Sequence, residues 1–362
     1  MEKPDKIFQE ETPAQGKKLF SVWKMLLPVA IGLCVVGWLL WRDATKEDIG
    51  EVLRGMHFTW RTWLCFGFCL LFMFGRDWGM SWRFRTLTNR ELSWWQAFKV
   101  QLLVEFTSCI TPSAVGGSSM GMVFLNSQGI EFGRAVTLMM TTLFLDELYL
   151  VVFCPIIVLL TPGGELFVSG SGALNQGIRL TFWLVYGVIA LWTLTLFCGI
   201  IWKPAWMRGF LKKITEWRPL RRWQDKAVEL GDNMVATSRE LRNKPVGFWV
   251  RVFGGTSLSW FSRYLVVNAL FFGFVASADA EQWIIFAREF VLWVVLMVSP
   301  TPGGSGLSEW LFSNYYGDIV HSAGLALILA IIWRLFSYYL YLIIGAIIVP
   351  GWVKSTYRRL KR

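Results

Sequence analysis

The sequence lacks the short motifs that mark many soluble enzymes. Neither HExxH nor GxGxxG occurs, and the two histidines, His57 and His321, lie far apart without metal-ligand spacing. The six cysteines include no CxxC pair and fall within or beside apolar stretches, so we expect them to pack rather than bind metal or form disulfides. No polar stretch is long enough for a catalytic domain. We therefore expect no enzymatic activity, no cofactor and no metal site.

What the sequence has in abundance is apolar residues. Of the 362 residues, 54% are hydrophobic and 22 are tryptophan. Such content, arranged in runs of membrane-spanning length, is typical of a polytopic helical membrane protein, and the tryptophans suit its interfacial belts. The net charge is 36 − 25 = +11, which in such a protein reports topology rather than nucleic-acid binding. We expect no nucleic-acid partner and leave homo-oligomers open.

Six apolar runs are long enough to cross a bilayer. They are residues 22–41, 62–82, 132–160, 180–202, 248–276 and 319–350. Residues 1–20 are polar and mixed in charge, unlike a cleaved signal peptide, so the run 22–41 should be an uncleaved anchor after a cytoplasmic tail. Residues 203–245 are polar with apolar residues at helical spacing. This pattern favours an amphipathic helix on the inner membrane surface, with a solvated linker helix as the alternative.

Proline and glycine interrupt two apolar regions in nearly the same way. The first break, at residues 111–117, lies in ITPSAVGGSSMGMV, and the second, at 300–306, lies in VSPTPGGSGLSEWL. Each break leads into a segment too short to cross a membrane. Non-helical backbone at membrane depth is tolerated only where protein buries it or it lines a cavity. Paired breaks in two halves of a chain therefore point to a transporter binding site.

Positive charge selects one topology. Residues 203–251 hold twelve Lys and Arg, and the N-terminal tail through Lys24 and the C-terminal tail hold five each. All basic regions are cytoplasmic only if both broken segments are re-entrant hairpins. We therefore predict an all-α inverted-topology repeat with six full spans, two re-entrant hairpins and cytoplasmic termini. The two repeats are residues 21–161 and 177–350, and a basic tail follows at 351–362.

Charged residues within the spans should face the protein interior, because each costs about 2.5–3.5 kcal/mol at the bilayer centre. Asp146 and Glu147 lie in the run 132–160, and Arg334 lies in the last run. We expect one of the acids to pair with Arg334 across the two halves, either as a structural ion pair or for substrate handling. Arg76 and Asp77 are expected to pair locally or to lie near the interface.

Two further acids flank the breaks. Glu105 precedes the first break and Glu309 follows the second. Three roles suit them: binding a cation, relaying a proton, or accepting hydrogen bonds from free backbone amides.

The breaks themselves suggest an anion site. Proline ends a helix, and glycine permits positive φ and close backbone approach. Ser118 or Ser305 would cap the next short helix, whose free N–H groups and dipole suit a phosphate. Simple helix breaking for packing is the alternative, and no lysine is present for a nucleotide-binding P-loop. The candidate substrate-binding residues are Thr111, Pro112, Gly116, Gly117, Ser118, Thr301, Pro302, Gly303, Gly304, Ser305 and Arg334.

At these positions the chain resembles the lysylphosphatidylglycerol synthase transmembrane family, flippase-like proteins that include the membrane part of the multiple peptide resistance factor. The resemblance covers most of residues 20–350. It rests on Thr111-Pro112-Ser113, Gly116-Gly117, Pro300 to Gly304, Gly306, Glu309, Trp82-Arg83 and Arg334. It implies a protein of the bacterial cytoplasmic membrane that moves a lipid or lipid-linked headgroup between leaflets. Bifunctional relatives carry a C-terminal aminoacyltransferase domain. Here the chain stops soon after the last span, so aminoacylation is not expected.

Three functions stay open. The first is translocation of an anionic or headgroup-modified lipid, whose headgroup would meet the hairpin amides and Arg334 in a cavity between the repeats. The second is a membrane-embedded lipid-modifying transferase, or an accessory subunit of one, with Asp146 and Glu147 catalytic. The third is ion-coupled transport of a soluble solute. The expected partners are membrane lipids that are anionic or carry phosphate.

Overall fold

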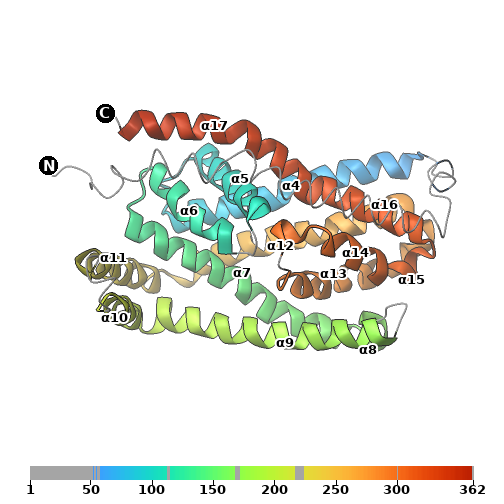
Figure 1. Ribbon diagram of the computed structural model, residues 1–362, viewed down its shortest axis with the longest axis horizontal. Coiled ribbons are helices and arrows are strands. Elements are labelled where there is room, and N and C mark those ends of the chain that lie inside the picture. Colours follow the sequence, from blue (N-terminus) through green and yellow to red (C-terminus); the bar gives the residue numbers. More distant parts are fainter. Residues whose placement is uncertain are drawn as a thin grey trace.

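The computed structural model describes residues 58–360, apart from 112–114, 168–171, 217–223 and 300, together with residues 52 and 54. Within these ranges the chain is helical and contains no strand. The long helices run along the long axis of the molecule, with α17 on one edge and α9 on the opposite edge (Figure 1). The predicted tail 1–20 and the predicted span 22–41 lie outside the described residues.

Five long helical stretches correspond to the remaining predicted spans. They are α4 Trp60–Leu87, α7 Phe132–Leu160, α9 Gly172–Phe197 with η2 Cys198–Trp202, α12 Val246–Phe274, and α16 Ala323–Arg334 with η6 Leu335–Tyr339 and α17 Leu340–Leu360. Three of them are both long enough and apolar enough to cross a bilayer, at residues 132–160, 174–202 and 323–353. α4, with 28 residues, is about 42 Å long at 1.5 Å per residue, but it contains several arginines.

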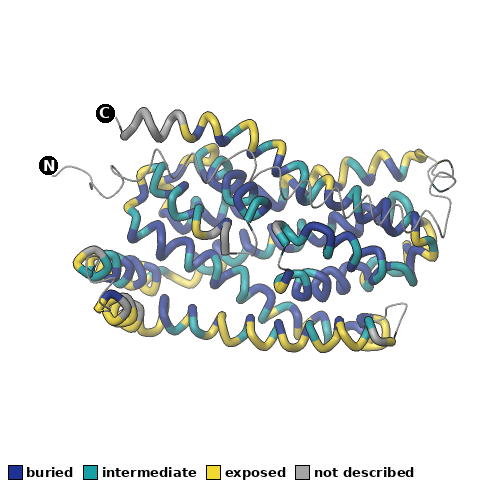
Figure 2. The backbone as a smooth tube through the Cα atoms, viewed as in Figure 1, coloured by how far each residue is buried: buried dark blue, intermediate teal, exposed yellow. Residues whose placement is uncertain are grey.

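The outer faces of these helices are exposed and apolar. Figure 2 shows exposed residues along the outside of α9 and buried residues through the middle of the molecule. Leu159, Leu184, Leu191 and Ile347 are among the large apolar side chains that are mostly exposed. Extended apolar surface of this kind marks a membrane-contacting face, so the chain is an all-α, multi-pass membrane protein.

Both predicted breaks separate pairs of short helices. The first pair is α5 Trp94–Ile110 and α6 Val115–Ser127; the second is α13 Gln282–Leu296 and α14 Leu307–Tyr315, with the turn η5 Pro302–Gly304 between them and α15 Gly317–Val320 after them. A Cβ added at Gly117 would meet Ser108, and one at Gly121 would meet Val104, so α6 folds back along α5. Likewise Arg288 donates to the Tyr315 carbonyl oxygen, at 3.1 Å. Each pair is therefore a helical hairpin.

The hairpins occupy opposite halves of the molecule. α5 and α6 lie in the half nearer to α10 and α11, whereas α13, α14 and α15 lie in the other half (Figure 1). The order of elements is the same in both halves of the chain: a long helix, a hairpin and a second long helix. These are α4, α5–α6 and α7 in the first, and α12, α13–α14 and α16–α17 in the second.

α4 and α12 pack closely along their length and run antiparallel. Gly273 opposes Cys65 at one end of the pair, and Gly79 opposes Gly255 and Ser259 further along. A Cβ at Gly79 would lie 2.5 Å from the Gly255 carbonyl oxygen, which no side chain tolerates. Small residues let membrane helices approach closely and gain dispersion contacts, and this seam joins the first half of the chain to the second.

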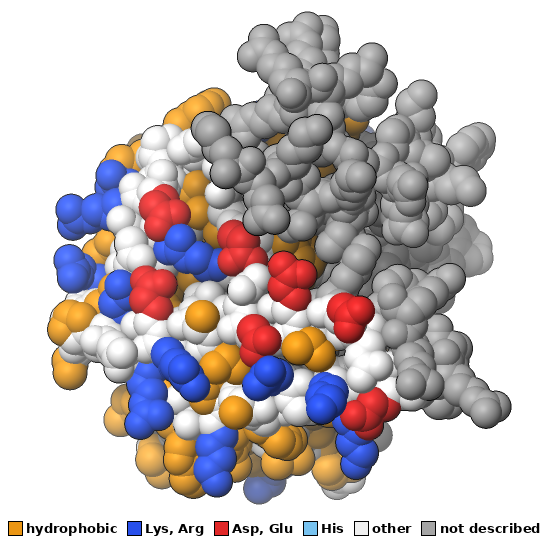
Figure 3. Space-filling model, turned by 90° about the vertical axis from the view of Figure 1, so that its left-hand side faces the viewer, with side chains coloured by type: hydrophobic (Ala, Val, Ile, Leu, Met, Phe, Trp, Pro, Cys, Tyr) orange, Lys and Arg blue, Asp and Glu red, His pale blue; other side chains and the backbone are white. Residues whose placement is uncertain are grey.

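The polar segment 203–245 forms two helices in its described parts, α10 Pro204–Thr215 and α11 Gln224–Arg242, rather than one. The exposed aromatic rings of Trp206 and Phe210 lie on α10, and the Asn233 amide of α11 donates to Glu131 at the start of α7, at 2.6 Å. The end of the molecule that carries these helices faces the viewer in Figure 3, where Lys and Arg side chains lie between Asp, Glu and hydrophobic ones. α17 ends at the same end of the molecule (Figure 1).

The largest differences from the predicted span limits are at α9 and at the last span. α9 begins at Gly172, eight residues before the predicted start at Leu180, because a helix continues past the apolar run when its polar residues face water. The last predicted span starts at Ile319, but His321 takes a left-handed φ of 57° and Ser322 caps a new helix, α16. The π-helical stretch η6 follows directly after Arg334, and such stretches are frequent at functional sites.

Candidate functional site

A cavity of about 270 Å³ lies between the two halves of the chain. Its walls come from α4, α5 and α7 of the first half and from α12, α13, the second break, α16 and η6 of the second half. Four arginines and four acids line it: Arg76, Arg83, Arg263, Arg334, Glu105, Asp146, Glu147 and Glu289. Charged residues inside a membrane protein are costly and usually functional, so this cavity is the candidate site.

Many of the residues predicted from sequence meet in this cavity. The lining includes Thr111, Thr301, Gly303, Gly304, Arg334, Glu105, Asp146 and Glu147. The remaining predicted residues stand elsewhere. Gly117 packs against Ser108, and Ser305 and Glu309 are buried beside Arg334. Gly116 lies in α6. Pro112 lies outside the described residues, and the side chains at positions 118 and 302 are not described.

Glu105 on α5 is the centre of the first charge cluster. Its carboxylate pairs with Arg76 of α4 and accepts hydrogen bonds from Arg263 of α12, at 3.3 Å, and from the Gln101 amide, at 2.9 Å. The Arg263 guanidinium lies over the rings of Trp260 and Trp293, at 4.8 and 4.6 Å from their centroids. One carboxylate therefore forms ion pairs with two arginines from different halves of the chain.

Asp146 on α7 is the centre of a second cluster. Arg83 of α4 binds it in bidentate fashion, with nitrogen–oxygen distances of 2.6 and 3.2 Å. The Trp260 indole N–H donates to the same carboxylate at 2.9 Å, and Arg83 also donates to Thr256 at 3.2 Å. This cluster likewise ties the first half of the chain to α12. Paired N–H···O bonds fix orientation as well as charge.

The second break is held by Glu309. One carboxylate oxygen accepts the Gly306 backbone N–H at 2.7 Å and the Ser308 hydroxyl at 2.8 Å, and the other accepts Arg334 Nε at 3.0 Å. Of the three roles expected for Glu309, the geometry shows hydrogen bonding to a free amide. Ser305 does not cap α14 as predicted: Gly306 is the N-cap, and the Ser305 hydroxyl accepts from Arg334 at 3.3 Å.

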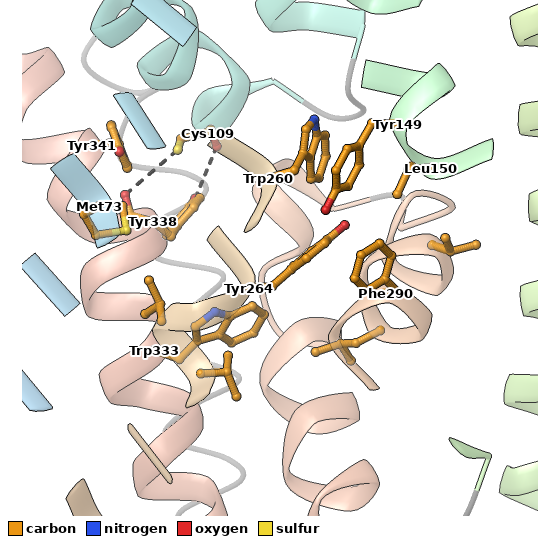
Figure 4. Close-up of a cluster of buried hydrophobic side chains, with 14 of the residues drawn as sticks. Met73, Cys109, Tyr149, Leu150, Trp260, Tyr264, Phe290, Trp333, Tyr338 and Tyr341 are labelled. Atoms are coloured by element: carbon orange, nitrogen blue, oxygen red, sulfur yellow. Dashed lines mark hydrogen bonds between the residues drawn. The ribbon is translucent and has the colours of Figure 1, made fainter. Parts of the chain in front are cut away.

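Glycine is required in the second break by geometry. Gly303 and Gly304 have φ values of 57° and 72°. A Cβ at Gly303 would also lie 2.1 Å from the Tyr338 ring. The Tyr338 hydroxyl in turn donates to the Cys109 carbonyl oxygen at the end of α5, at 3.3 Å, as the dashed lines between these two residues indicate (Figure 4). The two breaks therefore approach each other beside the cavity.

The predicted pair between Arg334 and an acid of α7 is wrong. Arg334 binds Glu309 within its own half, and Asp146 binds Arg83. Of the two alternatives predicted for Arg76 and Asp77, local pairing is wrong, since Asp77 accepts the Tyr341 hydroxyl, at 2.8 Å, and Arg76 binds Glu105. Successive residues of a helix point in different directions, which is why Arg76 and Asp77 do not meet.

Two cavity acids lack a cationic partner. Within the described ranges, neither Glu147 nor Glu289 forms an ion pair, and Glu147 Oε2 is buried without a hydrogen bond. Glu289 accepts the Tyr316 hydroxyl at 3.0 Å. Buried aromatic rings pack behind the lining residue Trp260: Tyr149 stacks on Trp260 at 5.8 Å, and Tyr264 packs against Phe290 at 4.4 Å (Figure 4).

The predicted site lacked four of the charged lining residues, namely Arg76, Arg83, Arg263 and Glu289. Arg76, Arg263 and Glu289 lie in apolar runs that the sequence marks as spans or a hairpin helix, and the rule that charges in such runs face a protein interior or a cavity would have added them. Arg83 lies one residue beyond the predicted span 62–82, so only the longer helix α4 brings it into the cavity wall.

The stretch Gly117 to Gly121 reads GSSMG and so fits the GxSxG pattern of serine hydrolases. In those enzymes the serine sits on a sharp strand-to-helix turn with a histidine nearby. Here Ser119 lies inside α6, and the exposed His321 lies beyond α15 in the second half of the chain. The stretch therefore does not form a nucleophile elbow.

Comparison with known proteins decides the family. A sequence model described as the lysylphosphatidylglycerol synthase TM region matches residues 25–345. The chain belongs to this family. A relative described as a UPF0104 membrane protein, from Archaeoglobus fulgidus, is 22% identical over 281 residues, which are 74% of this chain and 80% of that protein. No solved structure matches the chain significantly.

The region that matches the family model includes the residues that line the cavity from both halves of the chain. The matched region spans α4 to the first residues of α17, so both hairpins and all four lining arginines fall inside it. Two motif residues of the second break, Gly303 and Gly304, form the turn that lines the cavity. A third, Glu309, binds the lining residue Arg334.

Proposed function

We propose that the protein moves a lipid with a phosphate-bearing headgroup between the leaflets of a bacterial cytoplasmic membrane. The observation that carries this proposal is the cavity, in which both breaks and four arginines meet between two similar halves of the chain. A cavity between repeats, at interrupted helices, is where transporters of this kind bind their substrates. Membership of a lysylphosphatidylglycerol synthase membrane family supports a lipid-related role.

The proposal places the two hairpins in the membrane as re-entrant elements that enter from opposite sides. The halves 21–161 and 177–350 then form an inverted repeat. Support comes from the position of the hairpins in opposite halves of the molecule and from α17, which ends at the same end as α10 and α11 (Figure 1). Both of these segments are rich in Lys and Arg, which favours a common cytoplasmic side.

The headgroup would meet guanidinium donors rather than a net positive surface. Four arginines and four acids line the cavity, so its formal charge is balanced. However, the Nε atoms of Arg76, Arg83 and Arg263 are buried without a hydrogen-bond partner among the described residues. Unused donors on charged groups favour an anion, and Arg263, which shares Glu105 with Arg76, is the arginine that we expect to bind it.

The test is a leaflet-resolved assay in proteoliposomes made from native lipid extract and a trace of fluorescent phosphatidylglycerol. A membrane-impermeant reductant reports how fast the inner-leaflet probe reaches the outer leaflet. We expect wild-type protein to move the probe and Arg263→Gln to be about tenfold slower or worse, since a hydrogen bond to a charged group contributes about 1.5–3 kcal/mol. Arg61→Gln, which removes an arginine that binds Asp279 away from the cavity, should leave the rate unchanged. Equal rates with and without protein would refute lipid translocation.

Ion-coupled transport is the second candidate, and the two acids without cationic partners favour it. Glu147 and Glu289 line the cavity, where a proton or cation would neutralise them. Under this candidate, an imposed pH gradient drives uptake of a soluble solute, and Glu289→Gln removes the dependence on the gradient. Lipid movement without any gradient would favour the first proposal instead.

A further inference from the structure

A second pocket, which we call the arginine–tryptophan pocket, opens on the surface where α4 ends and α12 begins. Its volume is about 350 Å³. It is lined by Trp82, Arg85, Thr86, Asn89, Arg90, Trp94, Phe248 and Arg251. It shares no residue with the central cavity: Arg83 faces the cavity, whereas the neighbouring Trp82 lines this pocket.

The turn after α4 brings two of the arginines together. The Arg90 backbone N–H bonds the Arg85 carbonyl oxygen at 2.8 Å, and the Asn89 N–H bonds the Thr86 carbonyl oxygen at 3.1 Å. Asn89 and Arg90 have φ values of 53° and 66°. This pair of bonds is a Schellman motif, which ends a helix and reverses the chain. The Asn89 side chain also donates to Glu240 of α11 at 2.7 Å, which fixes the turn.

The third arginine comes from the second half of the chain. Because α4 and α12 are antiparallel with Gly79 facing Gly255, the end of α4 meets the start of α12, which carries Arg251. Arg251 Nε donates to the Gly247 carbonyl oxygen at 3.0 Å. Arg85 Nε donates to the Leu92 carbonyl oxygen at 3.2 Å, and its guanidinium lies 4.8 Å from the Trp94 ring centroid. Both guanidinium groups are therefore held in place through Nε.

The charge of this pocket is not balanced. No acid lines it, and in the described part of the chain Arg85, Arg90 and Arg251 form no ion pair. The acids close in sequence are used elsewhere: Glu91 pairs with Arg134, and Glu240 pairs with Lys244. A cation in the last turn of a helix is stabilised by the helix dipole, which accounts for Arg85. It does not account for Arg251, which lies near the positive end of α12.

The surroundings place the pocket at a membrane–water boundary. Trp94 stacks on Trp78 at 4.4 Å, and the side chains of Trp78, Trp94 and Trp95 are exposed. Exposed tryptophans gather at the level of lipid headgroups, and guanidinium groups bind phosphate oxygens through paired hydrogen bonds. We propose that the arginine–tryptophan pocket binds the phosphate of an anionic lipid headgroup at the surface of the protein, separately from the central cavity.

The experiment measures binding, so its result does not depend on whether the protein moves lipids. The purified full chain in detergent is titrated with dioctanoyl phosphatidylglycerol, with dioctanoyl phosphatidylcholine and with inorganic phosphate, and bound molecules are counted by native mass spectrometry. The test variant is Arg85→Gln/Arg251→Gln. The control variant is Arg239→Gln/Arg242→Gln, which removes two exposed arginines of α11. Thermal unfolding confirms that both variants are folded.

We expect the control variant to bind as many phosphatidylglycerol molecules as wild type with the same affinities, and the test variant to bind one of them about tenfold more weakly, because the charge-assisted hydrogen bonds of the arginine–tryptophan pocket are lost. Phosphatidylcholine should bind more weakly than phosphatidylglycerol to wild type. Equal phosphatidylglycerol affinity in the two variants would overturn the proposal. Binding of inorganic phosphate that displaces phosphatidylglycerol at equal concentration would show a site for free phosphate and overturn the lipid assignment.

Discussion

The carboxylate of Glu105 in α5 accepts a hydrogen bond from Arg263 in α12, at 3.3 Å, while it also pairs with Arg76 in α4. α5 and α12 belong to different halves of the chain, so this one acid joins the halves at the edge of the cavity. Both arginines are largely buried, and among the described residues neither forms another ion pair. Glu105 is therefore the residue on which the charge balance of this wall depends.

The first prediction concerns that balance. Glu105→Gln leaves Arg76 and Arg263 buried without a counter-charge, and removing one partner of a buried ion pair costs about 3–5 kcal/mol. We expect a clearly lower midpoint of thermal unfolding in detergent. Glu91→Gln, which removes an exposed acid paired with Arg134, should shift the midpoint little. Equal midpoints would contradict a structural role for Glu105.

The second prediction separates stability from transport at Arg334. Arg334→Ala leaves Glu309 charged, buried and without its guanidinium, so we expect both unfolding at lower temperature and loss of lipid movement. The double variant Arg334→Ala/Glu309→Gln removes the unpaired charge but keeps an acceptor for the Gly306 N–H. We expect it to recover stability without recovering transport. Recovery of both would mean that Arg334 acts only through folding.

The third prediction concerns the second break. Gly303→Ala forces a Cβ onto a residue with φ of 57° and to within 2.1 Å of Tyr338. Left-handed backbone and overpacking together cost at least about 2 kcal/mol. Gly187→Ala in α9, where a Cβ meets nothing within 4 Å, should be neutral or slightly stabilising. Thermal unfolding measures both, and a neutral Gly303→Ala would show that the break rearranges freely.

The fourth prediction tests the re-entrant arrangement. Ser93 and Gln128 lie at the two ends of the first hairpin, and Ala280 and Ala323 flank the second. Single cysteines at the first two positions should react with an impermeant maleimide from one side of the membrane, and those at the last two from the other side. The described native cysteines are buried or half-buried, which keeps background labelling low. If the cysteines at positions 93 and 128 were labelled from opposite sides, the first hairpin would cross the membrane and the re-entrant arrangement would be wrong.

Local sequence accounts for the helices and their interruptions. Ser93 with Gln96 forms the capping box that starts α5, and the proline and glycine positions coincide with the ends of α5 and α13. The short segment predicted to follow the second break is α14, Leu307–Tyr315. Helix starts and ends depend on residues a few positions apart, so they can be predicted from the sequence without knowledge of the tertiary structure. The eight additional helical residues at the start of α9 and the interruption at His321 were missed, because apolarity alone does not set helix ends.

By itself, then, the sequence determined that this is a membrane protein of long apolar helices with two similar interruptions, because apolar runs, prolines and glycines act locally. Only the tertiary structure decided that Arg334 binds Glu309, that Asp146 binds Arg83, and that Glu105 serves two arginines. Those ion pairs depend on which faces of the helices are in contact. The contact between α4 and α12 is determined by close packing of glycines that are far apart in the chain, and no local sequence pattern specifies which helix faces pack together.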